Sequence, residues 1–104
     1  MARTAKSKAS PILIERLSAE QIQSLHIPEK PMPHGPWNVW ECGPSAFNWH
    51  YDQEEKAFFY EGEVNVITPR EEVTIRKGDF VTFPKGLSCR WEVHQKVRKV
   101  YKFE

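Results

Sequence analysis

The chain has little cysteine, no long apolar run and no excess of charge of either sign. Its 104 residues include only two cysteines, and their spacing matches no metal-binding pair. No apolar run approaches the roughly 18 residues of a membrane span, and the N-terminus lacks the apolar core of an export signal. We therefore expect a cytoplasmic protein with reduced thiols and no membrane partner.

Charge is almost balanced, with 15 basic and 14 acidic residues and a formal net charge of +1. A dedicated nucleic-acid binder needs a basic face of one sign, so we expect no nucleic-acid partner. The first ten residues, MARTAKSKAS, contain three basic residues and no acidic one. We expect residues 1–10 to form a disordered basic tail and residues 11–104 to form a single domain.

Helix signals are confined to one short segment near the N-terminus. Ser18 begins the pattern S-A-E-Q, in which a serine N-cap and Gln21 at the third helical position form a capping box. The pattern predicts a helix from Ala19 to His26, preceded by an extended arm over residues 11–17. Residues 28–36 then hold four of the eight prolines, which indicates an irregular connection.

From Trp37 onward, alternation of apolar and polar residues predicts short β-strands separated by glycine and proline turns. The triplet Glu61-Gly62-Glu63 is expected to turn a hairpin. Many short strands with this punctuation predict an all-β sandwich or barrel. The expected strands are residues 37–41, 47–52, 55–60, 64–68, 73–76, 80–83, 89–94 and 97–103.

Two patterns in this β region resemble the sequence motifs of cupins. Glu55 and Gly62 match the end of the first motif, and Gly78, Pro84 and Gly86 match the opening of the second. With FPKG-L-x-C-x-W, the chain is similar to small single-domain cupins grouped with the (S)-ureidoglycine aminohydrolase cupin domain. The resemblance covers residues 37–103. It implies an all-β cupin-type jelly-roll barrel (a double-stranded β-helix) with an N-terminal arm, one short helix and a central pocket.

In metal-binding cupins, three histidines and a glutamate line the central pocket. The resemblance places Trp49, Tyr51, Glu55 and Cys89 at these four positions, so one position keeps its usual residue. The chain's four histidines have no spacing typical of a metal pair.

A register shifted by one residue would instead turn Asn48 and His50 into the pocket. Pleat parity favours the unshifted register, because Phe47, Trp49 and Tyr51 form the apolar face of their strand.

The predicted ligand pocket consists of Trp49, Tyr51, Glu55, Cys89 and Trp91. Aromatic walls beside a carboxylate suit a small polar or cationic molecule. No histidine lies on the predicted inner face to act as a base for the thiol, which disfavours a nucleophilic role.

Lys99 and Tyr101 alternate on the last strand. The sequence allows these two side chains to lie either at the pocket rim or on the ordinary barrel surface.

Three functions stay open, and the sequence does not decide whether the chain is an enzyme. The first is a binding protein for a small polar or cationic molecule, with a degenerate metal site. The second is a metal-dependent enzyme of the aminohydrolase type, since the resemblance points to manganese-dependent ureidoglycine aminohydrolase. Glu55 and Cys89, with Tyr51 or His50, would then bind zinc, iron or manganese. The third is a non-catalytic homo-oligomeric module, with a homodimer formed through residues 64–68 or the N-terminal arm.

Overall fold

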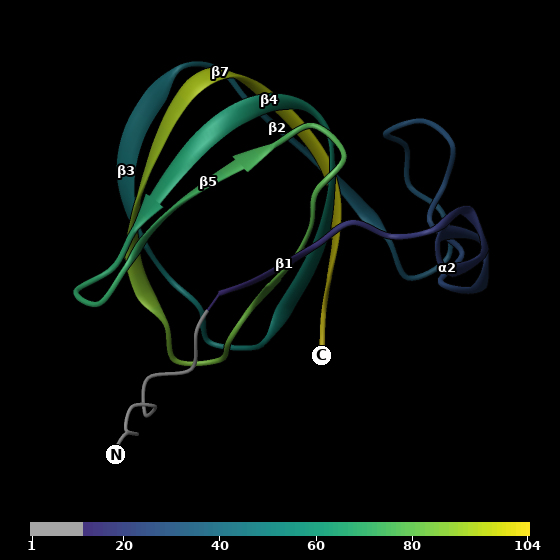
Figure 1. Ribbon diagram of the computed structural model, residues 1–104, viewed down its shortest axis with the longest axis horizontal. Helices are drawn as coiled ribbons and strands as arrows, with labels where there is room; N and C mark the ends of the chain where they lie inside the picture. Colours follow the sequence, from purple (N-terminus) through teal and green to yellow (C-terminus); the bar gives the residue numbers. More distant parts are fainter. Residues whose placement is uncertain (1–11) are drawn as a thin grey trace.

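The computed structural model describes residues 12–104, and the predicted disordered tail, residues 1–10, lies outside the described residues. Seven antiparallel strands form one sheet that rolls into a barrel, with a short helix to one side (Figure 1). None of the helical segments in this part of the chain has the length and apolar character needed to span a bilayer. In chain order the elements are β1 (Leu13–Glu15), α2 (Ala19–Ser24), β2 (Asn38–Cys42), β3 (Ser45–His50), β4 (Glu55–Ile67), β5 (Glu72–Arg76), β6 (Phe80–Phe83) and β7 (Ser88–Phe103).

Two long strands, β4 and β7, run through the whole barrel. They have 13 and 16 residues and pair from Glu55 opposite Phe103 to Ile67 opposite Arg90. Each changes its other neighbour midway: β4 pairs first with β6 and then with β5, and β7 pairs first with β3 and then with β2. The barrel therefore consists of two sheet halves that share β4 and β7, and the interior lies between them.

The predicted hairpin at Glu61-Gly62-Glu63 is wrong, because β4 continues through these residues. Gly62 has a φ of 105° and lies where the register between β4 and β7 shifts. A Cβ atom on Gly62 would lie 2.4 Å from the carbonyl oxygen of Lys96. Glycine is thus required for the close approach of two bent strands at a β-bulge, and not for a chain reversal.

The uninterrupted path of β4 and β7 corrects two further expectations. Residues 89–94 and 97–103 are parts of one strand, β7. Residues 64–68 were predicted to be an exposed sheet edge that could pair in a homodimer. This prediction is wrong, because residues 64–67 pair with β5 on one side and β7 on the other.

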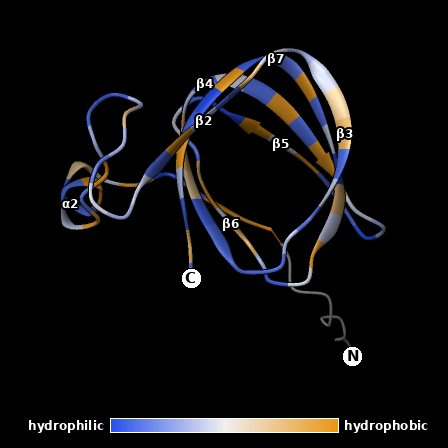
Figure 2. Ribbon diagram, turned by 180° about the vertical axis from the view of Figure 1, so that it is seen from behind, coloured by the Kyte–Doolittle hydropathy of each residue, from blue (hydrophilic) through white to orange (hydrophobic). Residues whose placement is uncertain are grey.

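The predicted capping box is confirmed at the start of α2. The backbone N–H of Gln21 donates to the Ser18 hydroxyl at 3.1 Å, and the backbone N–H of Ser18 donates to the Gln21 side chain at 2.8 Å. The helix ends at Ser24, earlier than the predicted His26. It packs with Trp37, whose indole N–H donates to the carbonyl of Leu25 at 3.0 Å. Figure 2 shows α2 beside the barrel, where it leaves the interior free.

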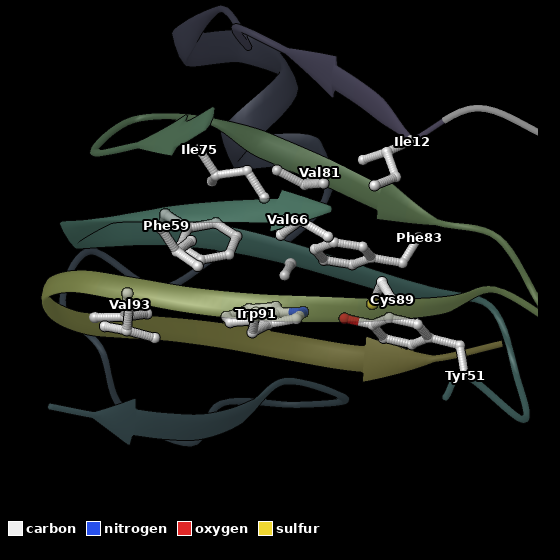
Figure 3. Packing of buried hydrophobic residues seen from close by; sticks show 13 residues of the cluster. Ile12, Tyr51, Phe59, Val66, Ile75, Val81, Phe83, Cys89, Trp91 and Val93 are labelled. Atoms are coloured by element: carbon white, nitrogen blue, oxygen red, sulfur yellow. The ribbon is translucent and has the colours of Figure 1, made fainter. Parts of the chain in front are cut away.

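The barrel interior holds the main hydrophobic core (Figure 3). On the side of β5 and β6 it contains the fully buried aliphatic residues Val64, Val66, Ile75 and Val81, together with Phe83. Aromatic rings continue the core toward the other side, where Trp91 stacks on Phe59 with ring centroids 6.4 Å apart. The core thus changes from branched aliphatic side chains to flat rings across the barrel.

Candidate functional site

A cavity of about 330 Å³ lies on the aromatic side of the interior. Its volume falls within the range of roughly 300–1,000 Å³ that is typical of small-molecule sites. Glu55 and Lys99 are the charged residues of its wall, and the other lining residues are aromatic. The cavity is lined by Trp40, Phe47, Trp49, Tyr51, Glu55, Trp91, Lys99, Tyr101 and Phe103.

The two charged residues of the cavity form a buried ion pair. The Lys99 Nζ donates to Glu55 Oε2 at 2.6 Å, and the two side chains are only 6% and 5% exposed. Pleat parity explains the arrangement, because Glu55 and Lys99 are on neighbouring strands and both point inward. A carboxylate and an ammonium therefore lie side by side in a wall that is otherwise aromatic.

Aromatic rings surround the ammonium group of Lys99. Its Nζ lies 4.9 Å from the ring centroid of Trp91, 5.0 Å from that of Trp40 and 5.5 Å from that of Tyr101. Rings at these distances stabilise a cation through their quadrupoles. Burial lowers the pKa of Lys99, and the charge of Glu55 opposes this shift. The amine of Lys99 is consequently held between a carboxylate and aromatic rings, where water is scarce.

Tyr51 and Trp91 are two wall residues whose rings also carry polar groups. The Tyr51 ring stacks on Phe83 with centroids 4.8 Å apart. Burial raises the pKa of Tyr51 well above its usual value, and the charge of Glu55 adds to this effect, so the hydroxyl stays neutral. The indole N–H of Trp91 is buried and has no hydrogen-bond partner among residues 12–104. In Figure 3 its nitrogen is turned toward the hydroxyl end of Tyr51.

Cys89 lies next to the cavity and does not line it. It pairs with Trp49 across β3 and β7 and is only 8% exposed. Its accessible side borders a shallow depression that it shares with His50 and Arg90. Burial raises the pKa of Cys89 to about 11, so the thiol is neutral at physiological pH. Both cysteines of the chain are free thiols.

The structure thus brings four of the five predicted pocket residues together around one cavity. These are Trp49, Tyr51, Glu55 and Trp91. Trp49 is half-exposed and forms the rim.

The strand register is the one that pleat parity favours. Asn48 and His50 do not line the cavity, and His50 Nδ1 instead lies 2.7 Å from the Ser88 hydroxyl oxygen in an exposed position.

The positions that hold a metal in other cupins do not fit one here. The carboxylate of Glu55 is engaged by Lys99 at 2.6 Å, and Cys89 does not line the cavity. Within residues 12–104, no three His, Cys, Asp or Glu side chains are grouped so that they could hold a metal ion together. Glu55 and Cys89 therefore do not form a donor set for a metal ion.

Sequence reasoning did not place Lys99 in the site. The signal that could have found it is the alternation of the last strand, in which Val97, Lys99, Tyr101 and Phe103 share one face. Val97 is fully buried, so that face had to point into the barrel. A lysine on the inner face then requires an inward carboxylate, and Glu55 is the predicted one.

Comparisons with known proteins agree with this architecture. A family model described as the EutQ-like cupin domain matches residues 31–101. A DUF861 family protein from Thermotoga maritima is 39% identical over 90% of this chain and 100% of its own, with a TM-score of 0.81. The Clostridium difficile EutQ protein is 22% identical over 62% of this chain and 52% of its own, with a TM-score of 0.58. A putative ethanolamine utilization protein Q from Salmonella typhimurium is 20% identical over 96% of this chain and 74% of its own, with a TM-score of 0.58. No curated protein matches the chain.

The rolled antiparallel sheet with a central cavity defines the protein as a cupin, which confirms the predicted jelly-roll fold. More narrowly, the chain belongs to the EutQ-like cupin domain family. The likeness to the two EutQ proteins is below 25% identity and concerns the fold alone. The closer kinship with ureidoglycine aminohydrolase stays a prediction.

Proposed function

We propose that the protein binds a small planar molecule that carries an amide or ureido group, with this group against Glu55 and Lys99. The observation that carries the proposal is the buried ion pair in the aromatic wall of a cavity of about 330 Å³. The ion pair sets a hydrogen-bond donor and an acceptor side by side. An amide offers the complementary acceptor and donor in one plane.

The chemistry of the wall supports this assignment. The ammonium of Lys99 has three N–H donors and uses one of them on Glu55, so a ligand carbonyl oxygen can accept another. The carboxylate of Glu55 can accept from a ligand N–H. The aromatic rings of the wall suit stacking on a flat ligand.

Charge favours a neutral polar ligand over a cationic one. The sequence left both ligand types open because a lone carboxylate in an aromatic pocket attracts cations. In the structure, Lys99 already neutralises Glu55 at 2.6 Å. A cationic ligand would have to displace Lys99 or meet its charge in a medium of low dielectric constant, which is unfavourable.

The other two functions receive less support from the described residues. A metal-dependent aminohydrolase needs a donor set that Glu55 and Cys89 do not provide. Self-association through the N-terminal arm remains open, since β1 pairs with β6 and no second strand of residues 12–104 covers its other side. This strand has only three residues, which limits the edge that it offers to a partner.

Tryptophan fluorescence tests the proposed function directly, because three of the four tryptophans line the cavity. Benzamide is the probe, and toluene is the matched ligand without the polar group. We expect benzamide to quench the fluorescence saturably with a Kd on the order of 1 mM or tighter, and toluene to bind at least several-fold more weakly. Equal binding of both ligands would show an apolar cavity without a role for the ion pair, and no saturable binding would contradict the proposed function.

A pair of lysine variants serves as the protein control. Lys102→Met changes a lysine of the same strand whose Nζ lies 5.1 Å from the Trp37 ring, on the outer side of the barrel. We expect it to bind benzamide like the original chain. Lys99→Arg keeps the positive charge but enlarges the donor group in the cavity, and we expect it to weaken benzamide binding.

A further inference from the structure

Lys99 is unusual among the lysines of the described chain because its side chain is 6% exposed and still faces a cavity. A buried amine that a small molecule can reach is the arrangement that covalent lysine chemistry requires. Beside it, Glu55 lies within hydrogen-bond distance, at 2.6 Å, and can move protons to and from the reacting atoms.

We propose that Lys99 forms a Schiff base with a small aldehyde or ketone that enters this cavity. The proposal rests on the proposed function, because the carbonyl group is bound at the same ion pair. It goes further, because Lys99 then acts as a nucleophile and not only as a hydrogen-bond donor. An aldehyde and an amide of the same shape occupy the site alike, and only the aldehyde is attacked.

The reaction uses only groups that the site contains. The ammonium of Lys99 transfers a proton to the Glu55 carboxylate, and the free amine attacks the carbonyl carbon, so that a C–N bond forms. The carbonyl oxygen takes up the proton that Glu55 returns and the second proton of the amine nitrogen, and it leaves as water when its C–O bond breaks. The product is a protonated imine on Lys99 beside an ionised Glu55. No oxidant or reductant is needed, and the step is reversible.

The surroundings of Lys99 stabilise the product as well as the starting ion pair. The iminium carries its positive charge at the position of the former ammonium, so Glu55 remains its counter-ion. The rings of Trp40 and Trp91, at 5.0 and 4.9 Å from Nζ, favour a cation there in either state. The wall thus imposes no electrostatic penalty on imine formation.

Burial also increases the fraction of Lys99 that is present as the neutral amine, relative to an exposed lysine. An exposed lysine has a pKa of about 10.4, so only about one side chain in 2,500 is neutral at pH 7. Burial lowers the pKa of Lys99, and each unit of lowering raises the neutral fraction about tenfold.

Reductive trapping tests the proposal on the full chain. The protein is incubated at pH 7 with benzaldehyde and sodium cyanoborohydride, which reduces an imine to a stable secondary amine. Peptide mass spectrometry then measures the benzylated fraction of every lysine. We expect Lys99 to be labelled several-fold above the exposed Lys77 and Lys85, and we expect excess benzamide to suppress labelling of Lys99 but not of these two.

The possible results separate this proposal from the proposed function. Labelling confined to exposed lysines, while benzamide still quenches the tryptophans, would overturn the Schiff base and leave the binding function standing. Failure of both labelling and quenching would overturn both. Lys99→Arg keeps a cation beside Glu55 and has no nucleophilic amine, so the benzamide-sensitive label should disappear in this variant. Its persistence at another residue would also contradict the assignment to Lys99.

Discussion

The two sides of the barrel interior are built from different side chains, and only one of them contains a cavity among its described residues. On the β5–β6 side, Val64, Val66, Ile75 and Val81 are fully buried, and most of the space is filled by branched aliphatic groups. On the β2–β3 side, flat rings and one ion pair surround a cavity of about 330 Å³. We call the β5–β6 side the packed side and the β2–β3 side, which contains the cavity, the hollow side. The same strand, β4, supplies Val64 and Val66 to the packed side and Glu55 to the hollow side. A closely packed region and a cavity therefore lie along one strand.

The largest expected effect follows from breaking the ion pair on the hollow side. Lys99→Met leaves the buried carboxylate of Glu55 without its cation, which costs about 3–5 kcal/mol of unfolding free energy. Urea denaturation measures the loss. The double variant Glu55→Leu/Lys99→Met removes both charges, and we expect it to regain most of the stability. A double variant as unstable as Lys99→Met would show that the loss comes from packing and not from an unpaired charge.

A change on the packed side should lower stability without altering the cavity. Ile75→Ala removes a fully buried side chain and leaves a void, at a cost of about 3–4 kcal/mol. Benzamide affinity, measured where the variant is still folded, should stay within about twofold of the original value, because Ile75 does not line the cavity. A large loss of affinity would show that the two sides are not independent.

Alkaline pH should lower the unfolding free energy through Cys89, which is buried beside the cavity. The pKa of Cys89 is about 11 in the folded protein and 9.0 for a free thiol, so the folded state holds its proton longer. This contribution is complete below pH 9 and is lost as the pH rises to about 11. The difference of about two units between the two pKa values limits this contribution to at most about 3 kcal/mol.

Unfolding free energies measured from pH 8 to 11 check this contribution. Cys89→Ala should flatten the dependence between pH 9 and 10. The loss that remains belongs to Tyr51 and Tyr60, whose pKa values are raised from 10.0. An unchanged slope in Cys89→Ala would assign the whole effect to the tyrosines.

The smallest effect on stability is expected at the rim of the hollow side. Trp49 is 50% exposed, so Trp49→Ala should cost less than about 1 kcal/mol. The same change removes part of the cavity wall and should weaken benzamide binding about tenfold, which corresponds to about 1.4 kcal/mol. An affinity that does not change would place the ligand deeper, away from Trp49.

Local patterns predicted the parts of this molecule that depend on neighbours in sequence. The Ser18–Gln21 capping box and the inward face of Trp49 and Tyr51 follow from spacing alone, and both are confirmed. The turn predicted at Gly62 was wrong because a glycine at positive φ suits a turn and a bulge equally well. Only the position of Lys96 on the partner strand, 2.4 Å from a Cβ at Gly62, distinguishes the two.

The candidate site was predicted in part, for a related reason. Glu55 was placed in the pocket by its family motif, but its partner is far away in sequence. The contact between Glu55 and Lys99 depends on the register of β4 against β7, which residue alternation does not specify. Cys89 shares the inward parity of Trp91, yet its depth along β7 sets it beside the cavity and not in its wall.

The long ladder between β4 and β7 has a consequence for the order of folding. Glu55 pairs with Phe103, so the first residue of β4 meets the last residue of β7. Pairings between such distant segments form slowly, because the loop between them must close first. The cavity is complete only when this ladder has closed, so its walls assemble after the local turns. The rate at which benzamide binding recovers during refolding would therefore measure the rate at which the barrel closes.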